Sequence, residues 1–430
     1  MSEVKKNRIT KKTGSFSLLN PFKGDRVIWI IFFFLTVISL VSVFSSIGYE
    51  AFITKRTPQY AFFRHAIFVI ATYIVVVVLS NFDYRKFAPA SWFGYLISIA
   101  LLLIAMIVGS EDLSSGSGMG RFINLPLIGR FQPSEFAKIV LVVYLARLLA
   151  MRKDVISNWK VFRNVVVTIL LVVVLIFPQN FSTAAIIAFV CFIMLRVAPV
   201  TVRHWRLTVL ALLTLAVLSI VIGTKYPNIP LLGRAGTWSG RIDKWLNYNT
   251  NEDVDGTTLE VTQENMARMA VASGRFFGVG VGSTVQARLM TQANNDMIFS
   301  IIVEETGMAG GCIVLILYIF LYIRCMRVAW RCKGYFGRMT VFGLGTLIFF
   351  QACIHICVSV GALPVTGQTL PLISSGGSAY LCMGLAIGII QSVAFDEKLK
   401  DVNTESVNSE SLNSESLNSK FVNSKSVNSN

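Results

Sequence analysis

The chain has 430 residues, of which 54% are hydrophobic and only 14% are charged, whereas about 25% are charged in a typical soluble protein. The formal charge is nevertheless +16, from 39 basic and 23 acidic residues. A soluble nucleic-acid-binding protein would carry such an excess on a surface rich in charge, and this chain has too few polar residues to cover a globule. The composition therefore excludes that class and a mostly disordered chain, and it indicates an integral membrane protein.

About ten apolar stretches could each cross the hydrocarbon core of a bilayer. They are Val27–Phe44, Ala61–Ser80, Phe87–Val108, Phe136–Ala150, Val161–Phe177, Thr183–Val197, Leu207–Gly223, Met308–Ile323, Met339–Gly361 and Ala379–Phe395. None of them alternates polar and apolar residues as the strands of a membrane barrel do. We therefore predict an all-α membrane domain of about ten transmembrane helices over residues 26–396, without a cleaved signal peptide.

Basic residues gather in alternate connections between these helices. One set of connections, which includes the basic N-terminal segment 1–25, holds 22 basic and 4 acidic residues, and the opposite set holds 12 and 10. The positive-inside rule places the first set and both termini in the cytoplasm. The longest connection, residues 224–296, then lies outside, and its length is typical of functional or disordered loops. We expect it to be ordered, because it carries Trp238, Trp245, Phe276 and Phe277.

The C-terminal segment, residues 397–430, repeats a five-residue unit. Equivalent positions of the repeat are occupied by Val402, Val407, Leu412, Leu417, Val422 and Val427. A period of five fits neither a helix nor a strand, so the sequence predicts a polar, disordered cytoplasmic tail.

Neither the seven cysteines nor the three histidines indicate a cross-linked or zinc-binding protein. The number of cysteines is odd, and all of them fall in predicted spans or on the cytoplasmic side, which argues against a disulfide framework. The histidines are scattered along the chain, so no zinc site is visible.

Charged residues within the predicted spans lie near the outer ends of their helices, where ionisable groups are candidates for function. Glu135 and Lys138 are three residues apart and share a helix face, which predicts either a structural ion pair or part of an outward-facing polar cavity. Four polar residues precede or flank this pair, namely Arg121, Arg130, Gln132 and Ser134. Basic groups beside a carboxylate suit a phosphate-bearing substrate, and arginines that contact lipid headgroups are the alternative.

A second group of acidic residues surrounds the end of the long loop. Asp296 lies where this loop enters the eighth helix, and Glu304 and Glu305 follow two to three turns later. A carboxylate at the mouth of an apolar helix can have a raised pKa and act as a general base. Alternatively, Asp296 is a helix N-cap, which would contribute about 1 kcal/mol to stability. From spacing alone, the cap is the simpler interpretation.

The third group is rich in Gly, Pro and Ser and precedes the last predicted helix. It reads Leu363-Pro364-Val365-Thr366-Gly367 and then Pro371-Leu372-Ile373-Ser374-Ser375-Gly376-Gly377-Ser378. Such residues break a helix at membrane depth, which is tolerated only where the backbone lines a cavity or packs within protein. We predict that Thr366, Ser374, Gly376, Gly377 and Ser378 donate hydrogen bonds to a headgroup, with close helix packing as the alternative.

Together, and in this order, the three groups resemble the signatures of the SEDS (FtsW/RodA) family. The matching runs are Gln132-Pro133-Ser134-Glu135 with Lys138, Asp296 with Glu304-Glu305-Thr306-Gly307, and Leu363 to Ser378. The resemblance covers residues 25–395 and jointly the motifs are highly specific. It implies a polytopic peptidoglycan glycosyltransferase that polymerises lipid II into glycan strands.

The resemblance also implies roles for single residues. Asp296 would be the base that deprotonates the GlcNAc 4-hydroxyl of lipid II, for attack on the MurNAc anomeric carbon with inversion. Undecaprenyl pyrophosphate leaves, and Lys138, Arg121 and Arg241 would offset its charge while Glu135 orients Lys138. The family is associated with a divalent cation, Mg²⁺ or Mn²⁺, and with no organic cofactor, although this sequence shows no defined metal cage.

Three positions depart from the family pattern. Asn180 stands where an acidic residue is common, which puts a metal or proton role there in doubt. Met297 replaces the common Phe after the aspartate, and Ser375 replaces the usual Tyr before the paired glycines. None of these changes removes the proposed base.

The basic N-terminal extension and the run Gly367-Gln368-Thr369-Leu370-Pro371 favour the division member of the family over the elongation member. The resemblance then implies a class B penicillin-binding protein and other divisome proteins as partners, in the bacterial inner membrane at the septum. We find no outer domain with the motifs of a transpeptidase, so crosslinking is assigned to the partner.

Two other classes of function compete with this interpretation. A lipid II flippase or other transporter would also use broken helices and intramembrane carboxylates. It predicts an internal repeat and charged residues near the bilayer midplane, whereas here no repeat is visible and the charges gather at one face. A scaffold without catalysis would need its surface but not Asp296.

Overall fold

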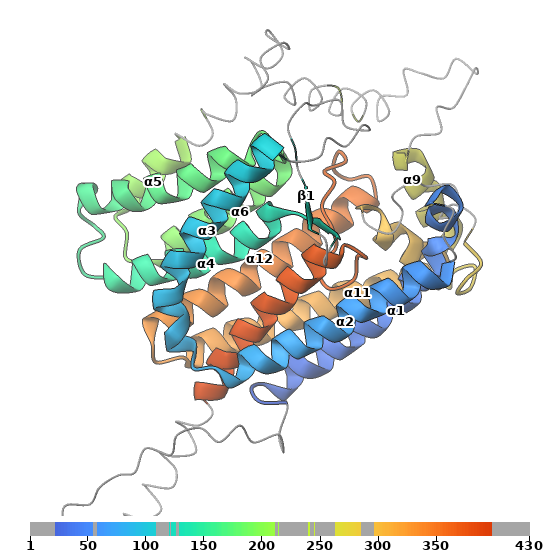
Figure 1. Cartoon of the computed structure of the whole chain (residues 1–430), viewed down its shortest axis with the longest axis horizontal. Coiled ribbons are helices and arrows are strands. Elements are labelled where there is room, and N and C mark those ends of the chain that lie inside the picture. Colours follow the sequence, from blue (N-terminus) through green and yellow to red (C-terminus); the bar gives the residue numbers. More distant parts are fainter. Residues whose placement is uncertain are drawn as a thin grey trace, which may run out of the picture.

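The computed structural model describes residues 22–54, 58–108, 120, 122–125, 129–210, 214, 240, 245, 263–284 and 296–397. These residues form a bundle of long helices with one short two-stranded hairpin (Figure 1). In chain order the elements are α1 (Arg26–Thr54), α2 (Pro58–Asn81), η1 (Tyr84–Lys86), α3 (Phe87–Val108), β1 (Ile123–Leu125), β2 (Gly129–Phe131), α4 (Pro133–Met151), α5 (Trp159–Ile176), α6 (Phe181–Val197), α9 (Gln263–Gly274), α11 (Ile298–Arg331), α12 (Tyr335–Ser359) and a C-terminal helix (Gly377–Glu397).

The predicted all-α membrane fold is confirmed over the described residues. Seven of their helices are long and apolar enough to span a membrane, and α4 and the shorter α6 also occupy predicted spans. Of the predicted helix Leu207–Gly223, residues 207–210 belong to a described helical stretch, 202–210, and most of the rest lies outside the described residues. The segments 1–21 and 398–430 also lie outside them, so the terminal assignments remain predictions.

Three features of the structure differ from the predicted elements. The eighth predicted helix, Met308–Ile323, lies in the part of α11 that follows a break at Gly307, and the structure adds a helical segment before the break, from Ile298. The hairpin of β1 and β2 was not predicted, because each strand has only three residues. Part of the long loop is the helix α9, so the expectation of order holds for this part, while Trp238 and most of the loop lie outside the described residues.

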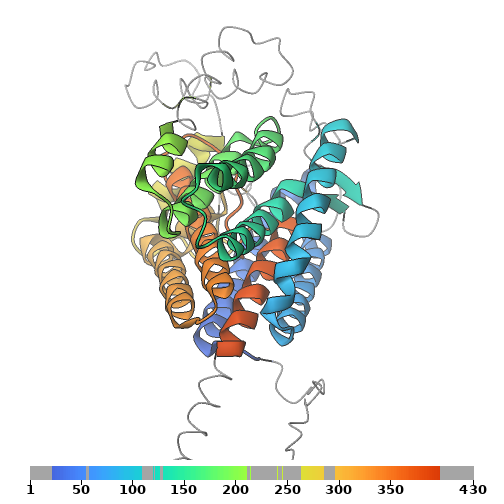
Figure 2. The same cartoon turned by 90° about the vertical axis from the view of Figure 1, so that its left-hand side faces the viewer.

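The helices are apolar on all sides because one side packs in the bundle and the other faces lipid. On α2, the most exposed large side chains are Phe63, Ile67, Ile70 and Ile74. Their spacing of three or four residues places them in one stripe along the helix. The opposite side of α2 packs against the C-terminal helix, where Gly384 lies against Thr72. α1, α2 and the C-terminal helix therefore run side by side (Figures 1 and 2).

α4 lies at the centre of the bundle and is buried along most of its length. It packs against α3, α5, α6 and α12. Close approach of these helices depends on small residues. At Gly343 of α12, a Cβ atom would come within 2.6 Å of both Val142 of α4 and Met194 of α6. Small residues let helix backbones approach in a membrane, where van der Waals contact drives association.

One end of the bundle collects the connections that were predicted to be cytoplasmic. The Asp25 amide donates to Gln391 Oε1 at 2.8 Å, and Gln391 Nε2 donates back to the Asp25 carbonyl at 3.1 Å. Arg324 on α11 pairs with the Asp25 carboxylate at 2.8 Å, and Arg85 lies 3.8 Å from Asp396. The start of α1 and the end of the C-terminal helix thus meet at the same end (Figure 2), as the predicted topology requires.

The Asp25 carboxylate joins two helices, and its loss is expected to destabilise the bundle. It caps α1 by accepting hydrogen bonds from the Val27 and Ile28 amides at 2.9 and 3.2 Å, and it also binds Arg324. Asp25→Ala should cost about 1 kcal/mol for the cap alone, with the loss of the ion pair in addition. Thermal unfolding of the purified protein in detergent measures this loss.

Asp83→Ala is the matched control, because Asp83 caps η1 by accepting from the Arg85 amide. If both variants lowered the unfolding temperature equally, the link between Asp25 and Arg324 would contribute nothing.

Candidate functional site

The chain between α12 and the C-terminal helix, residues 360–376, is irregular and lies partly inside the bundle. Gly367 has a φ of 62°, a left-handed conformation that glycine adopts readily. Pro364 and Pro371 each lack an amide donor and disfavour a helix. Gln368, Leu370 and the residues up to Ser374 are nevertheless mostly buried. The prediction that this segment breaks the helix and packs within the protein is therefore confirmed.

Side chains of α12 satisfy two carbonyl groups of this segment. His355 Nδ1 lies 2.7 Å from the Gln368 carbonyl oxygen, and Gln351 Nε2 donates to the Thr369 carbonyl at 3.0 Å. A carbonyl oxygen only accepts hydrogen bonds, so His355 must carry a proton on Nδ1. Gln351 and His355 are four residues apart and thus share one face of α12.

Two other helices bind the next part of the segment. The Tyr318 hydroxyl on α11 donates to the Pro371 carbonyl, and the Ser39 hydroxyl on α1 donates to the Ile373 carbonyl at 2.7 Å. Tyr318 and Ser39 are both buried. Side chains from three helices therefore replace the hydrogen bonds that a continuous helix would have supplied.

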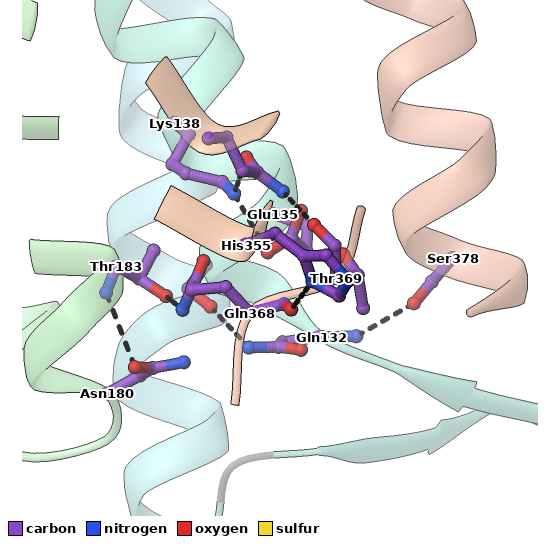
Figure 3. A network of polar contacts seen from close by, with 11 residues as sticks. Gln132, Glu135, Lys138, Asn180, Thr183, His355, Gln368, Thr369 and Ser378 are labelled. Carbon is purple, nitrogen blue, oxygen red and sulfur yellow. Dashed lines mark hydrogen bonds and ion pairs between the residues drawn. The ribbon is translucent and has the colours of Figure 1, made fainter. Parts of the chain in front are cut away.

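The predicted pair of Glu135 and Lys138 is present and buried in the centre of the bundle. Lys138 Nζ lies 2.9 Å from Glu135 Oε1, and the side-chain exposures are 0% and 4%. The ammonium group also donates to Gln351 Oε1 at 2.8 Å. Gln351 therefore connects Lys138 on α4 with the Thr369 carbonyl of the irregular segment (Figure 3).

The same network reaches the start of α6. Gln368 Nε2 donates to Thr183 Oγ1 at 2.8 Å, and the Thr183 amide donates to Asn180 Oδ1 at 3.3 Å (Figure 3). Asn180 is the N-cap of α6. Asparagine is among the most favoured residues at this position because its side-chain oxygen accepts an orphan amide. The amide at a position that is commonly acidic in the family therefore has a structural role in this chain.

The hairpin leads the chain into α4 and joins two of the predicted motifs. Its strands pair Ile123 with Phe131, and Gln132 follows directly. The Gln132 amide donates to Ser378 Oγ at 3.4 Å, while its side chain donates to Ser134 Oγ at 3.0 Å. The first motif, from Gln132 to Lys138, and the third motif, from Leu363 to Ser378, therefore lie together (Figure 3).

The second motif lies along the first turns of α11. Asp296 is half-buried, and the N-cap position of α11 is occupied by Met297. The interpretation of Asp296 as the N-cap of this helix is therefore wrong. Glu304 and Glu305 are both buried, and Glu305 accepts hydrogen bonds from the Ser45 hydroxyl on α1 and from the Gly282 amide, the latter at 3.0 Å. Glu305 thus joins α11 to α1 and to the loop after α9.

The remaining predicted residues have mixed outcomes. Ser374 Oγ accepts from the Leu370 amide at 2.7 Å, so it stabilises the irregular segment itself. Gly377 begins the C-terminal helix, and a Cβ atom there would lie 2.6 Å from the Phe68 ring on α2, which favours the packing alternative.

Thr366 and Gly376 are half-buried. Arg121 and Arg241 lie outside the described residues.

Sequence reasoning missed Gln351, His355 and Gln368, which hold the network together. A usable signal was present, because Gln351 and His355 are two polar residues at helical spacing in an apolar span. Polar groups at membrane depth are expensive and face the protein interior. Gln351 and Gln368 are neutral amides, so neither charge nor metal-ligand chemistry distinguishes them in the sequence, and His355 is one of three scattered histidines.

The buried ion pair predicts non-additive effects on stability. Glu135→Gln leaves the Lys138 charge buried without its counter-ion, and breaking such a pair costs about 3–5 kcal/mol. The double variant Glu135→Gln with Lys138→Met removes both charges and is expected to cost less than Glu135→Gln alone. Thermal unfolding of both variants and of Lys138→Met completes a double-mutant cycle. A double variant as unstable as the sum of the single variants would show that the two side chains do not interact.

The chain is similar in sequence to known proteins along most of its length. Residues 25–399 match the family model described as "Cell cycle protein", for FtsW, RodA and SpoVE. A protein of Hydrogenovibrio crunogenus named probable peptidoglycan glycosyltransferase FtsW is 30% identical over 336 residues, which cover 77% of this chain and 80% of that protein. A Geobacter sulfurreducens protein of the same name is 28% identical over 379 residues, 86% of this chain and 95% of its own length. These names agree with the predicted enzyme class.

Two solved structures have the same fold. The rod shape determining protein RodA of Thermus thermophilus aligns with a TM-score of 0.61 at 22% identity, covering 87% of this chain and 97% of that one. A chain from a peptidoglycan synthase complex, studied for the coordination of polymerization and crosslinking, aligns with a TM-score of 0.66 at 22% identity over 87% of this chain and 98% of its own. With the family model matching most of its length, the chain belongs to the FtsW, RodA and SpoVE family.

Proposed function

We propose that this protein is a peptidoglycan glycosyltransferase that polymerises lipid II into glycan strands and releases undecaprenyl pyrophosphate. The observation that carries the proposal is the meeting of the first and third family motifs around Lys138, a fully buried cation held by Glu135 and Gln351. The names of the curated relatives support the same activity.

Asp296 is the proposed general base. It lies at the entrance to α11, where the long outer loop rejoins the bundle. In the proposed step, Asp296 takes the proton of the GlcNAc 4-hydroxyl as the oxygen attacks the MurNAc anomeric carbon. The new glycosidic bond forms as the bond from that carbon to the pyrophosphate oxygen breaks, so the configuration inverts. The electron pair of the broken bond leaves with undecaprenyl pyrophosphate.

Lys138 is proposed to stabilise the charge that develops on the leaving pyrophosphate. A cation surrounded by low-dielectric protein acts more strongly on a nearby charge than one in water. Glu135 and Gln351 fix the ammonium position before the reaction, since both bind it directly. Arg121 and Arg241 are proposed to assist it, and Gln132, Ser134, Thr366 and Ser378 to bind the substrate headgroup.

A divalent cation is part of the family resemblance. Among the described residues, no three His, Cys, Asp or Glu side chains come together in a way that would hold a metal ion. The described part of the chain therefore does not fit a cation site built from three such side chains, and no step of the proposed reaction passes through a metal.

The base assignment predicts a large loss of activity for Asp296→Asn. Removal of a general base typically reduces the rate by about 10²–10⁴-fold, because the hydroxyl then attacks without a proton acceptor. Polymerisation of purified lipid II by the protein, assayed together with its transpeptidase partner, measures the change. Asp154→Asn is the matched control, because Asp154 is an exposed residue between α4 and α5.

If Asp296→Asn polymerised lipid II as well as the parent, the base assignment would fail. If the parent moved lipid II across liposome membranes without polymerising it, and Asp296→Ala did so equally well, the protein would be a flippase. If the Asp296→Ala chain still supported growth of a depleted strain, a scaffold role would be favoured.

The partner is proposed to be a class B penicillin-binding protein, which would supply the crosslinking of new strands. The related chain from a peptidoglycan synthase complex supports this pairing. We also propose that the protein acts in division, with other divisome proteins at the septal inner membrane, because the curated relatives above are named FtsW.

A fluorescent fusion expressed at native level should therefore gather at midcell in dividing cells. Fusions to known septal and side-wall proteins in the same cells provide the two references. A fusion spread along the side wall would instead assign the protein to elongation, as for RodA.

A further inference from the structure

The kink of α11 frees backbone groups that a continuous helix would have paired. Gly307 has φ 72° and ψ −173°, a conformation that breaks the helix between Glu304 and Met308. Carbonyl and amide groups on either side of such a break lose their helical partners. In a membrane-spanning helix these groups need other partners, because the hydrocarbon core offers none.

The turn that follows α9, residues 274–282, supplies those partners. The Val279 and Gly280 amides donate to the Glu304 and Glu305 carbonyls at 2.9 and 3.0 Å. In return, the Met308 amide donates to the Arg275 carbonyl at 2.9 Å. The turn is therefore bonded to both sides of the break through its backbone.

The close approach of the two backbones requires glycine in the turn. Gly278 has a φ of 79°, and a Cβ atom at this position would lie 2.1 Å from the Glu305 carbonyl oxygen. Gly280 and Gly282 also have positive φ angles. The turn is thus held in one conformation against α11, rather than projecting freely from the protein.

The depth of this turn in the membrane follows from counting residues along α1 and α11. Arg324, two turns before the end of α11, binds Asp25, the residue before α1, and we take this ion pair as the level of the predicted cytoplasmic boundary. Glu305 lies 19 residues from Arg324, and its partner Ser45 lies 19 residues from Arg26. At 1.5 Å per residue, both counts place the turn about 28 Å from that level. The hydrocarbon core is about 30 Å thick, so the turn lies at its outer boundary.

Apart from Arg275, the side chains that the turn presents outward are apolar. Phe277 is 83% exposed, Phe276 is 62% exposed, and Val279 and Val281 are 45% and 60% exposed. The patch continues onto the exposed Met308 of α11, which precedes a row of exposed residues facing lipid further along that helix, Ile313, Ile316 and Phe320. An aqueous loop would not be expected to expose two adjacent phenylalanines, whereas apolar side chains are stable at the boundary of headgroups and acyl chains.

We propose that the turn 274–282 is a membrane anchor, whose side chains Phe276, Phe277, Val279 and Val281 insert into the outer leaflet of the bilayer. The occupant of this apolar patch is lipid, because the patch lies at bilayer depth and is continuous with the lipid-facing side of α11. The anchor holds the described end of the long outer loop against the membrane, directly beside the kink that follows Glu304 and Glu305. It extends the membrane contact of the chain beyond its spanning helices.

The test places an environment-sensitive NBD fluorophore on Phe277→Cys in the full-length protein. The background variant carries serine in place of Cys312, Cys353 and Cys357, the three cysteines that are not buried. The protein is reconstituted in vesicles of phosphatidylethanolamine and phosphatidylglycerol. Quenching by a lipid with a doxyl group at carbon 5 is compared with quenching by aqueous iodide.

Ile316→Cys and Asp154→Cys are the matched references for lipid and for water, since Ile316 is exposed on α11 and Asp154 is exposed in a polar connection. The label at position 277 should be quenched by the doxyl lipid at least about threefold more strongly than the label at position 154, as expected for insertion of 5–10 Å. Iodide should show the reverse order. Val281→Cys should behave as Phe277→Cys does, which covers the case that one variant misfolds.

Two outcomes would overturn the proposal. Labels at positions 277 and 281 that iodide quenches as strongly as the label at position 154 would place the turn in water. Labels that neither quencher reaches would show that protein covers the patch, either a second copy of the chain or a partner.

Discussion

An irregular backbone inside a membrane protein must find hydrogen bonds within the protein, because lipid supplies none. Much of the centre of this structure meets that requirement for residues 368–373. Side chains from α12, α11 and α1 bind four carbonyl groups of the segment. Each of these bonds comes from a different side chain, so the segment fixes how three helices sit relative to one another. A change in any of these donors would leave a buried carbonyl unpaired.

The need of the irregular segment for hydrogen bonds also links it to Lys138, the only buried lysine among the described residues. Gln351 has one donor and one acceptor end, and it uses them for the Thr369 carbonyl and the Lys138 ammonium. A charged group at this depth is costly unless it is paired, and Glu135 with Gln351 supplies the pairing. The position of the cation is therefore set by the path of the irregular backbone. Lys138, the proposed contact for the leaving pyrophosphate, therefore lies beside a helix break.

The kink in α11 is a second case of the same constraint. Here the partners are backbone groups of the turn after α9, rather than side chains. This difference explains why the turn needs glycine at position 278, since a Cβ atom there would meet the backbone of α11. It also ties the described part of the outer loop to a spanning helix. The face predicted to lie outside is thus assembled from two broken helices, α11 and the pair of α12 and the C-terminal helix.

The sequence by itself determined the class of the fold and most of its helices. The apolar runs can cross the hydrocarbon core of a bilayer, and the basic residues are distributed unevenly between the connections. Neither property depends on tertiary contacts. The motifs also identified Glu135, Lys138 and Ser378, because their spacing and order are properties of the chain. The ion pair of Glu135 and Lys138 could be predicted since both residues lie on one turn of one helix.

Only the tertiary structure decided which groups meet across helices. Gln351, His355 and Gln368 are neutral residues far from the first motif in sequence. The helical spacing of Gln351 and His355 in an apolar span marks a polar face, but it does not show which groups this face meets. The helical segment before Gly307 was not predicted as part of the eighth helix, because Gly307 breaks the helix. The turn after α9 binds the backbone groups on both sides of this break, and that contact is visible only in the tertiary structure. Lys138 and Gln351 are more than 200 residues apart in sequence and form a hydrogen bond. Helix packing brings such residues together, and the sequence alone does not show this packing.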